Sequence, residues 1–253
     1  MRRAGVAAVV AVVLAACETP PESGTLSVYA ASSLTEAFSE LETAFEAAHP
    51  DIDVSVTYAG SQILRLQIEQ GAPADVFASA NLEHMQTLVD SGLVAESRVF
   101  VQNELVVIVP LDNPAGIESL EDLPEASRVV LGTRNVPVGR YARDVLRLAA
   151  PTLGEGFEAM VLYRVVSEET NVRLARAKVE LGEADAAIVY RTDAGSSDRV
   201  RIVEIPSEFN VIADYPIGVL RRTTVPATAE AWVGLLMSPE GRTVLARHGF
   251  IVE

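Results

Sequence analysis

Hydrogen-bond donors recur in this sequence where an expected strand gives way to an expected helix. The first N–H groups of a helix have no partner within the helix, and the helix dipole adds partial positive charge there. Together with hydroxyl groups, they suit the binding of an anion. A lone serine at such a place is more often a plain helix cap, so several junctions facing one cleft would be needed to indicate a site. Four junctions qualify: Ser33-Leu34-Thr35-Glu36, which fits a capping box, Ser61, Pro137-Val138-Gly139 and Thr170-Asn171-Val172.

The elements that would position these junctions alternate between strand and helix. Hydrophobic periodicity predicts strands at 26–31, 52–58, 75–80, 104–110, 128–131, 162–166, 186–190 and 201–205. It predicts helices at 34–48, 63–70, 82–91, 140–150, 172–181, 230–236 and 239–248, the fourth of them stopped by Pro151. This alternation predicts an α/β fold with mostly parallel sheets, in which ligands bind at the carboxyl ends of strands. No linker divides the chain after residue 24, which suits two lobes that share it, with crossings at 101–104 and 213–217.

Catalytic and metal-binding patterns are missing from the sequence. There is no GxSxG, HExxH or GxxxxGK[ST] motif. Because His49, His84 and His248 lie far apart and lack ligand neighbours at helical spacing, we interpret them as surface or helix-end residues and expect no metal site. The segment 154–159 matches GxGxxA but follows Pro151 rather than a strand, so we interpret it as a loop.

The net charge of the chain limits the kinds of molecule that it could bind. The chain has 253 residues, with 35 acidic against 20 basic side chains and a net charge of −15. Because phosphate binding needs a basic face, this excess of acid argues against nucleic acid as a partner. The acidic residues are scattered along the chain, which is typical of a solvated surface.

The N-terminus is typical of an export signal. Arg2 and Arg3 precede an uncharged run at 4–16 that is too short to span a membrane. The run ends Leu14-Ala15-Ala16-Cys17, which looks like a bacterial lipobox, and a Pro-rich polar tether follows. We therefore expect a signal peptide at 1–16, a tether at 17–24 lipidated at Cys17, and a protein anchored outside the cytoplasmic membrane. The alternative is that Cys17, the only cysteine, is a free thiol.

The sequence resembles the periplasmic molybdate-binding proteins, the substrate receptors of molybdate ABC transporters. The resemblance covers the chain from about residue 26 to its end. The blocks that carry it occur in the family's order, namely Val28-Tyr29-Ala30-Ala31-Ser32-Ser33-Leu34-Thr35, Tyr58-Ala59-Gly60-Ser61, Gly71-Ala72-Pro73-Ala74-Asp75-Val76-Phe77, Pro137-Val138-Gly139-Arg140-Tyr141-Ala142, Asn171-Val172-Arg173 and Ala187-Ile188-Val189-Tyr190. Asn81 stands where the family would have Asp, and because Asn can also cap a helix we expect little functional change.

The resemblance implies a type II periplasmic binding-protein fold: two α/β lobes, joined by two crossings, with the ligand cleft between them. It places lobe 1 at 25–103 plus 214–253 and lobe 2 at 104–213. It also implies a monomer without cofactor that binds molybdate or tungstate and delivers the anion to a permease. Carried over by position, Ser33 and Ser61 donate from lobe 1, Val138 and Val172 donate backbone N–H bonds from lobe 2, and Tyr190 donates its phenol.

A site of this composition fits a ligand that only accepts hydrogen bonds. Molybdate has no proton at neutral pH, whereas monohydrogen phosphate would need an acceptor, which the set lacks unless a serine oxygen supplies it. Sulfate must be distinguished by size. Two alternatives stay open: a receptor for another oxyanion or a small organic anion, and an enzyme on the same fold that uses Tyr190 or an acidic residue, although no acid–base pair stands out.

Overall fold

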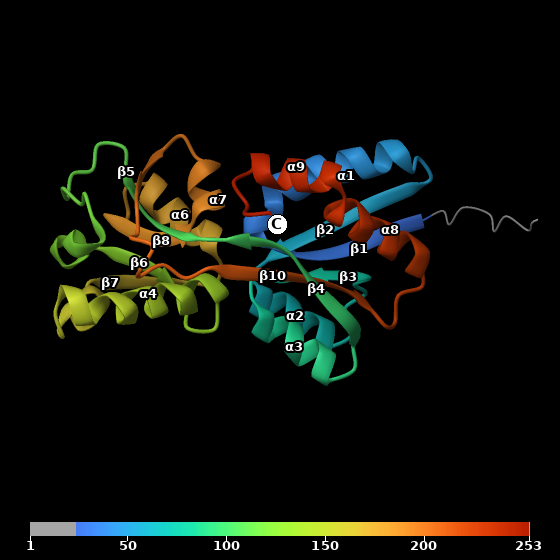
Figure 1. Ribbon diagram of the computed structural model, residues 1–253, viewed down its shortest axis with the longest axis horizontal. Helices are drawn as coiled ribbons and strands as arrows, with labels where there is room; N and C mark the ends of the chain where they lie inside the picture. Colours follow the sequence, from blue (N-terminus) through green and yellow to red (C-terminus); the bar gives the residue numbers. More distant parts are fainter. Residues whose placement is uncertain (1–23, 253) are drawn as a thin grey trace, which may run out of the picture.

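The protein forms two α/β lobes side by side, each built on one five-stranded sheet (Figure 1). The structure is a computed structural model and describes residues 24–252. The strand orders are β2-β1-β3-β10-β4 and β7-β6-β8-β5-β9. In each sheet the first three strands run parallel, while the fourth runs antiparallel to both of its neighbours. The prediction of an α/β fold is confirmed, but the sheets are mixed rather than mostly parallel, because the fourth strand of each makes two antiparallel pairings.

The first lobe combines the beginning and the end of the described chain. Its strands are β1 (Gly24–Ala31), β2 (Ile52–Ala59), β3 (Val76–Ala78), β4 (Val94–Asn103) and β10 (Ala213–Leu220). Helices α1 (Thr35–Ala48), α8 (Pro226–Met237) and α9 (Pro239–Arg247) cover one face, and α2 (Ser61–Glu69) and α3 (Leu82–Asp90) cover the other (Figure 1). A 3-10 turn, η1 (Ser32–Leu34), connects β1 to α1.

The second lobe is one continuous stretch of chain. Its strands are β5 (Leu105–Pro110), β6 (Val129–Gly132), β7 (Val165–Glu169), β8 (Ala186–Tyr190) and β9 (Val200–Val203). Its helices are η2 (Leu120–Glu125), α4 (Pro137–Leu153), α5 (Phe157–Tyr163), α6 (Val172–Glu180) and α7 (Arg191–Gly195). In Figure 1, α4 lies on one side of the sheet and α6 and α7 lie on the other.

Two segments cross between the lobes. The first passes from β4 through Glu104 into β5, and the second enters β10 after β9 (Figure 1). Both were expected to be extended, but each contributes a full strand to the first sheet, where β10 lies between β3 and β4. In β4, the five residues after Val94 are all exposed, and buried residues return only in the last four positions. This explains why the sequence of β4 lacks an apolar strand signal.

The core follows the apolar runs of the sequence. Leu105 to Val109 are all fully buried in β5, which confirms the prediction of a strand covered on both faces. In the first lobe the core is centred on Trp232 of α8, whose ring meets those of Phe38 and Phe45 edge-on at centroid distances of 5.6 and 5.5 Å. Burial of such large rings contributes several kcal/mol to holding α1 and α8 together.

The region around residue 151 differs from the expectation. Helix α4 passes through Pro151 and ends at Leu153, before Gly154 with φ +116°. Because Pro151 has no N–H to donate, α4 continues past it with one backbone hydrogen bond fewer. The expected loop at 154–159 contains the start of α5, and the strand expected at 162–166 begins only at Val165.

Candidate functional site

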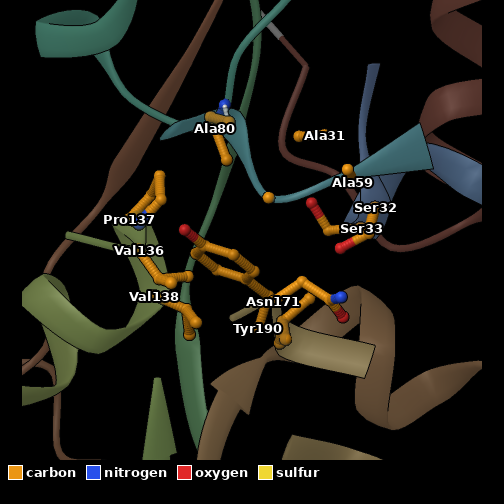
Figure 2. Close-up of a pocket in the computed structure, with 13 residues that line it drawn as sticks. Ala31, Ser32, Ser33, Ala59, Ala80, Val136, Pro137, Val138, Asn171 and Tyr190 are labelled. Carbon is orange, nitrogen blue, oxygen red and sulfur yellow. Dashed lines mark hydrogen bonds between the residues drawn. The ribbon is translucent and has the colours of Figure 1, made fainter. Parts of the chain in front are cut away.

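A small pocket between the lobes gathers the residues singled out from the sequence (Figure 2). Its empty volume is about 210 Å³, part of which is open to solvent. The five expected ligand residues Ser33, Ser61, Val138, Val172 and Tyr190 all line it, and all are buried. The other lining residues are Ala31, Ser32, Ala59, Gly60, Ala80, Val136, Pro137 and Asn171.

Ser33 reaches the pocket from the 3-10 turn after β1. The expected capping box at 33–36 is wrong, because η1 separates Ser33 from α1 and no side chain caps that helix. The Ser33 hydroxyl instead lies 2.8 Å from the phenol oxygen of Tyr215 on β10. The local turn is held by Thr35, whose hydroxyl donates to the Ser32 carbonyl at 2.7 Å.

Ser61 is the first residue of α2 and enters the pocket from the other side of the same sheet. Its hydroxyl oxygen accepts a hydrogen bond from the Ala80 backbone N–H at 3.0 Å. Gly60 precedes it as the N-cap residue, with no side chain to cap the helix. A Cβ at Gly60 would collide with the Thr170 carbonyl oxygen of the second lobe, so the missing side chain permits this close approach of the lobes.

Val138 lies in the first turn of α4, where N–H groups lack helical partners. This turn packs tightly on the end of β6, because a Cβ at Gly139 would collide with the Gly132 and Thr133 carbonyl oxygens. The buried guanidinium of Arg143 also holds the turn, donating to the Gly132 carbonyl at 2.8 Å and the Gly139 carbonyl at 2.6 Å. Val138 is 1% exposed and lines the pocket.

Val172 is the first residue of α6 and follows the N-cap residue Asn171. The Asn171 side chain accepts from the Leu174 N–H at 3.1 Å, as an N-cap residue does. Asn81 caps α3 in the same way, accepting from the His84 N–H at 3.2 Å, so the expectation that it would serve as a cap is confirmed.

Tyr190 ends β8, and its phenol lies between the turn at 136–138 and the pair Ser32 and Ser33 (Figure 2). The residue is 1% exposed, and its hydroxyl has no hydrogen-bond partner among residues 24–252. Burial raises the pKa of Tyr190 well above its usual value, and the adjacent Tyr215 raises it further, so the phenol keeps its proton. A buried hydroxyl without a partner is costly, so this O–H is available to a ligand.

The pocket lining carries no charge. None of the 13 lining residues is Asp, Glu, Lys, Arg or His. Its polar side chains are the three serines, Asn171 and Tyr190, and three helix N-termini border it. An anion placed here would be held by neutral donors on helix ends.

Four polar contacts join the lobes around the pocket. The Gln62 amide donates to the Thr170 carbonyl at 2.8 Å, and Arg173 pairs with Glu36 at 2.6 Å. Arg140 of α4 pairs with Glu83 of α3. His84 Nε2 lies 3.0 Å from the Asn135 carbonyl. These contacts describe a closed arrangement of the two lobes.

His84 lies in the first turn of α3, which agrees with the expected helix-end position, but it is buried and contacts the second lobe. Burial lowers the pKa of its imidazole, so the neutral ring donates from Nε2. His248 lies near the end of α9, with its Nε2 2.9 Å from a Glu40 oxygen. His49 follows α1 as an exposed residue, its ring 4.4 Å from that of Phe45. Among residues 24–252 no three His, Cys, Asp or Glu side chains are grouped so that they could hold a metal ion.

A buried carboxyl group lies next to the ligand pocket. Asp193 of α7 is 1% exposed, and neither carboxyl oxygen has a partner in the described part of the chain. Burial raises the pKa of Asp193 to about 7, although Arg176 and Arg173 act in the opposite direction. The group is therefore largely protonated below neutral pH, which limits its repulsion of an anion.

Sequence reasoning missed several residues of this region. Ser32, Ala80 and Asn171 line the pocket, and Tyr215 lies directly behind Ser33. Ser32 and Asn171 lie beside predicted ligand residues, so their neighbours were a usable signal. Ala80 and Tyr215 had none, because only the fold brings them to the site. Cys17 and the expected signal peptide lie outside the described residues, and no helix within 24–252 is long and apolar enough to cross a membrane.

Comparisons with known proteins give the following matches. The family model described as "Bacterial extracellular solute-binding protein" matches residues 26–251. Molybdate-binding protein ModA of Mycobacterium tuberculosis is 36% identical over 226 residues, covering 88% of this chain and 83% of that protein. The periplasmic molybdate-binding protein of Azotobacter vinelandii superposes with a TM-score of 0.78 at 19% identity, covering 90% of this chain and 99% of that one. The sulfate-binding protein SubI of M. tuberculosis also gives 0.78, at 17% identity, covering 90% and 86%. The last two likenesses concern the fold.

Proposed function

The chain belongs to the bacterial extracellular solute-binding proteins that serve ABC transporters, and from this premise we propose that it binds molybdate and tungstate. The resemblance to molybdate-binding proteins found in the sequence is confirmed by the relatives at 36% identity. The sulfate-binding structural relative indicates that this fold accepts more than one tetrahedral oxyanion, so the choice of anion must be argued from the pocket itself.

The observation that carries the proposal is the composition of the pocket. Its lining offers the hydroxyl groups of Ser33, Ser61 and Tyr190 and the first N–H groups of α4 and α6, and it has no charged group. Molybdate and tungstate carry two negative charges and no proton at neutral pH, so every oxygen accepts hydrogen bonds. Hydrogen bonds to a charged acceptor contribute about 1.5–3 kcal/mol each, so a few neutral donors supply tight binding.

The same composition disfavours phosphate. Monohydrogen phosphate carries one O–H group, which would be left without an acceptor in this pocket at a cost of about 1–3 kcal/mol. Sulfate is an acceptor-only dianion like molybdate but smaller. It would leave some donors at longer distances, and we expect it to bind more weakly.

Removing the two serine hydroxyls together tests this assignment. The double variant Ser33→Ala with Ser61→Ala removes one oxygen from each side chain and leaves the Tyr215 hydroxyl and the Ala80 N–H without these partners, so its Tm is measured beside its binding. We expect it to lose molybdate binding in calorimetric titration, while the wild-type protein binds. Tight binding by the double variant would refute the residue assignment.

The rival functions make different demands on the site. The pocket is small and most of its lining residues are buried, so we expect it to favour a small oxyanion over a bulky organic anion. An enzyme would need an acid–base pair near the ligand, whereas Tyr190 is the only titratable side chain among the lining residues. A solute-binding role is the one that this lining supports.

The proposal includes export and a lipid anchor at the N-terminus. A signal peptide at 1–16 would be removed, Cys17 would be lipidated, and residues 17–24 would tether the protein to the outer face of the membrane. The change Cys17→Ser should release the protein into the soluble fraction. Retention of this variant with the membrane would contradict the lipid anchor.

Delivery requires the two lobes to move. We propose that residues 25–103 with 214–253, and residues 104–213, close over the anion as two bodies in a monomer, and that the closed form is presented to the permease. Small-angle scattering should then give a smaller radius of gyration with molybdate than without it, at the mass of one chain. An unchanged radius would contradict closure.

A further inference from the structure

The direction of one hydrogen bond behind the pocket decides what Ser33 offers to a ligand. The Ser33 and Tyr215 oxygens are 2.8 Å apart, and each hydroxyl could be the donor. If Ser33 donated to Tyr215, it would present lone pairs to the pocket. If Tyr215 donates to Ser33, the proton of Ser33 is left to point at the anion.

Asn103, the last residue of β4, settles this direction. The backbone N–H of Glu104 can only donate, and it lies 3.0 Å from Asn103 Oδ1. The amide is thereby oriented, so its NH₂ group faces the other way. That group lies 2.9 Å from the hydroxyl oxygen of Thr192 and 3.5 Å from the phenol oxygen of Tyr215.

The Tyr215 phenol in turn determines whether the Ser33 hydroxyl donates or accepts in the hydrogen bond between them. Its side chain is fully buried, and burial raises its pKa well above the usual value, so the phenol keeps its proton. The Asn103 NH₂ group occupies the acceptor side of the phenol oxygen. The acceptor within hydrogen-bond distance for the phenol proton is then the Ser33 oxygen.

We propose that Asn103 and Tyr215 are positioning residues that fix the Ser33 hydroxyl as a donor toward the bound anion. This inference rests on the proposed oxyanion binding and assigns a cause to its selectivity. With the Ser33 proton turned into the pocket, the serine does not offer its oxygen to a ligand that carries a proton. This relay of hydrogen bonds, from Asn103 through Tyr215 to Ser33, therefore prevents the Ser33 oxygen from accepting the proton of monohydrogen phosphate.

Ser61 has an equivalent arrangement built from the backbone. The Ala80 N–H donates to its oxygen at 3.0 Å, so the Ser61 proton is also left for the pocket. The backbone makes this direction permanent, whereas at Ser33 it depends on two side chains. Tyr215 and Asn103 are thus the places where the polarity of the pocket can be changed by substitution.

The position of the relay in the fold links it to both lobes. Asn103 and Tyr215 lie on the two neighbouring strands β4 and β10, which belong to the crossing segments. Through Thr192, Asn103 also contacts α7 of the second lobe, next to Tyr190. The rings of Tyr215 and Tyr190 meet edge-on, with centroids 5.7 Å apart. The groups that orient Ser33 therefore pack directly against another expected ligand of the anion.

A double-mutant cycle on the full-length protein tests the relay. Calorimetric titration with molybdate and with inorganic phosphate at pH 8 is carried out on wild type, Tyr215→Phe, Ser33→Ala and the double variant. Tyr215→Phe should weaken molybdate binding about five- to tenfold, less than the loss of a whole hydrogen bond to a charged acceptor, because the Ser33 hydroxyl remains and only its orientation is released. It should also bring the affinities for molybdate and phosphate closer together. In the Ser33→Ala background, Tyr215→Phe should alter molybdate affinity less than about twofold, because the Ser33 hydroxyl that Tyr215 orients is no longer present.

The results of this cycle distinguish a failure of the relay from a failure of the proposed oxyanion binding. An equal loss in both backgrounds, or no loss in wild type, would overturn the relay. Failure of the wild type to bind any oxyanion would instead overturn the proposed function. Tyr29→Phe removes the same hydroxyl from β1 of the same sheet, outside the pocket lining, and should change neither affinity. If Tyr215→Phe does not fold, Asn103→Ala takes its place, and its effect on the affinity ratio must likewise disappear in the Ser33→Ala background.

Discussion

The change Tyr190→Phe separates stability from binding in this protein. It removes one oxygen from a side chain that is 1% exposed, and that oxygen has no hydrogen-bond partner among residues 24–252. The ring keeps its edge-on contact with Tyr215 at 5.7 Å. The only interaction that we expect to be lost is the one between the phenol and a bound anion.

The expected changes in molybdate affinity and in stability both arise from the loss of the Tyr190 hydroxyl. A hydrogen bond to a charged acceptor contributes about 1.5–3 kcal/mol, so the dissociation constant for molybdate should rise roughly 10- to 150-fold. In the ligand-free protein, with the lobes apart, water can satisfy this hydroxyl, so its removal costs little stability. The ligand-free variant should therefore be about as stable as the wild type.

Thermal unfolding with and without saturating molybdate measures both effects together. Ligand in excess stabilises the native state in proportion to the logarithm of its concentration over the dissociation constant. The molybdate-dependent increase in Tm should thus shrink by about 3–12 °C, taking roughly 2–4 °C per kcal/mol for a chain of this size. The control Tyr29→Phe should keep the full increase.

Two results would refute this reasoning. A ligand-free Tm well below that of wild type would show that the Tyr190 hydroxyl already has a partner inside the protein. An unchanged molybdate-dependent increase would show that this hydroxyl does not contact the anion. Either result would remove Tyr190 from the proposed set of ligands.

Three further predictions concern the surroundings of the pocket. Because burial raises the pKa of Asp193 to about 7, the folded protein holds a proton there that the unfolded chain releases above about pH 4. Stability should fall as pH rises from about 4 to 7, and Asp193→Asn should remove this dependence in thermal unfolding and raise Tm at pH 8. Gly139→Ala should cost about 1–3 kcal/mol of stability in urea unfolding and weaken molybdate binding, because its Cβ would displace the first turn of α4 from the Gly132 carbonyl. Glu36→Gln should weaken binding about two- to fivefold at low salt, since it breaks the half-exposed pair with Arg173 across the cleft, and the loss should shrink at high salt.

Each of these has its own control. A Cβ at Gly234 of α8 would meet nothing within 4 Å, so Gly234→Ala should stabilise the protein slightly, and equal destabilisation at both glycines would contradict the packing argument. A wild-type Tm that rises between pH 4 and 7 in step with that of Asp193→Asn would contradict the buried proton. For Glu36→Gln, a loss of affinity that does not depend on salt would contradict an ion pair.

Local signals made much of the fold predictable. Strand–helix alternation, the run at 105–109 and helix starts such as Ser61 are properties of neighbouring residues, and the structure contains them. Pro151 misled the prediction, because α4 continues past this proline to Leu153 and the local sequence does not indicate that it does. Strand β4 was incompletely predicted, since its exposed polar residues hide its pairing with β10.

In the site, too, some residues could be predicted from the sequence, whereas contacts between distant segments could not. Ser33, Ser61, Val138 and Val172 lie at strand–helix junctions that the sequence pattern indicates. Tyr190 came from the family resemblance alone, as did the ligand role of all five residues, and the fold brings them to one pocket. The partner of Ser33 was out of reach, because Tyr215 is 182 positions away and lies in a segment with no motif. The contact of His84 with the Asn135 carbonyl likewise depends on how the lobes meet, which no local pattern encodes.

The central claim is that a neutral pocket of hydrogen-bond donors selects tetrahedral oxyanions that carry no proton. Calorimetric titration of the purified protein with molybdate, tungstate, sulfate and phosphate at one ionic strength tests it most directly. We predict tight and comparable binding of molybdate and tungstate, weaker binding of sulfate and the weakest binding of phosphate. Phosphate bound as tightly as molybdate, or no binding of any of the four, would contradict the account.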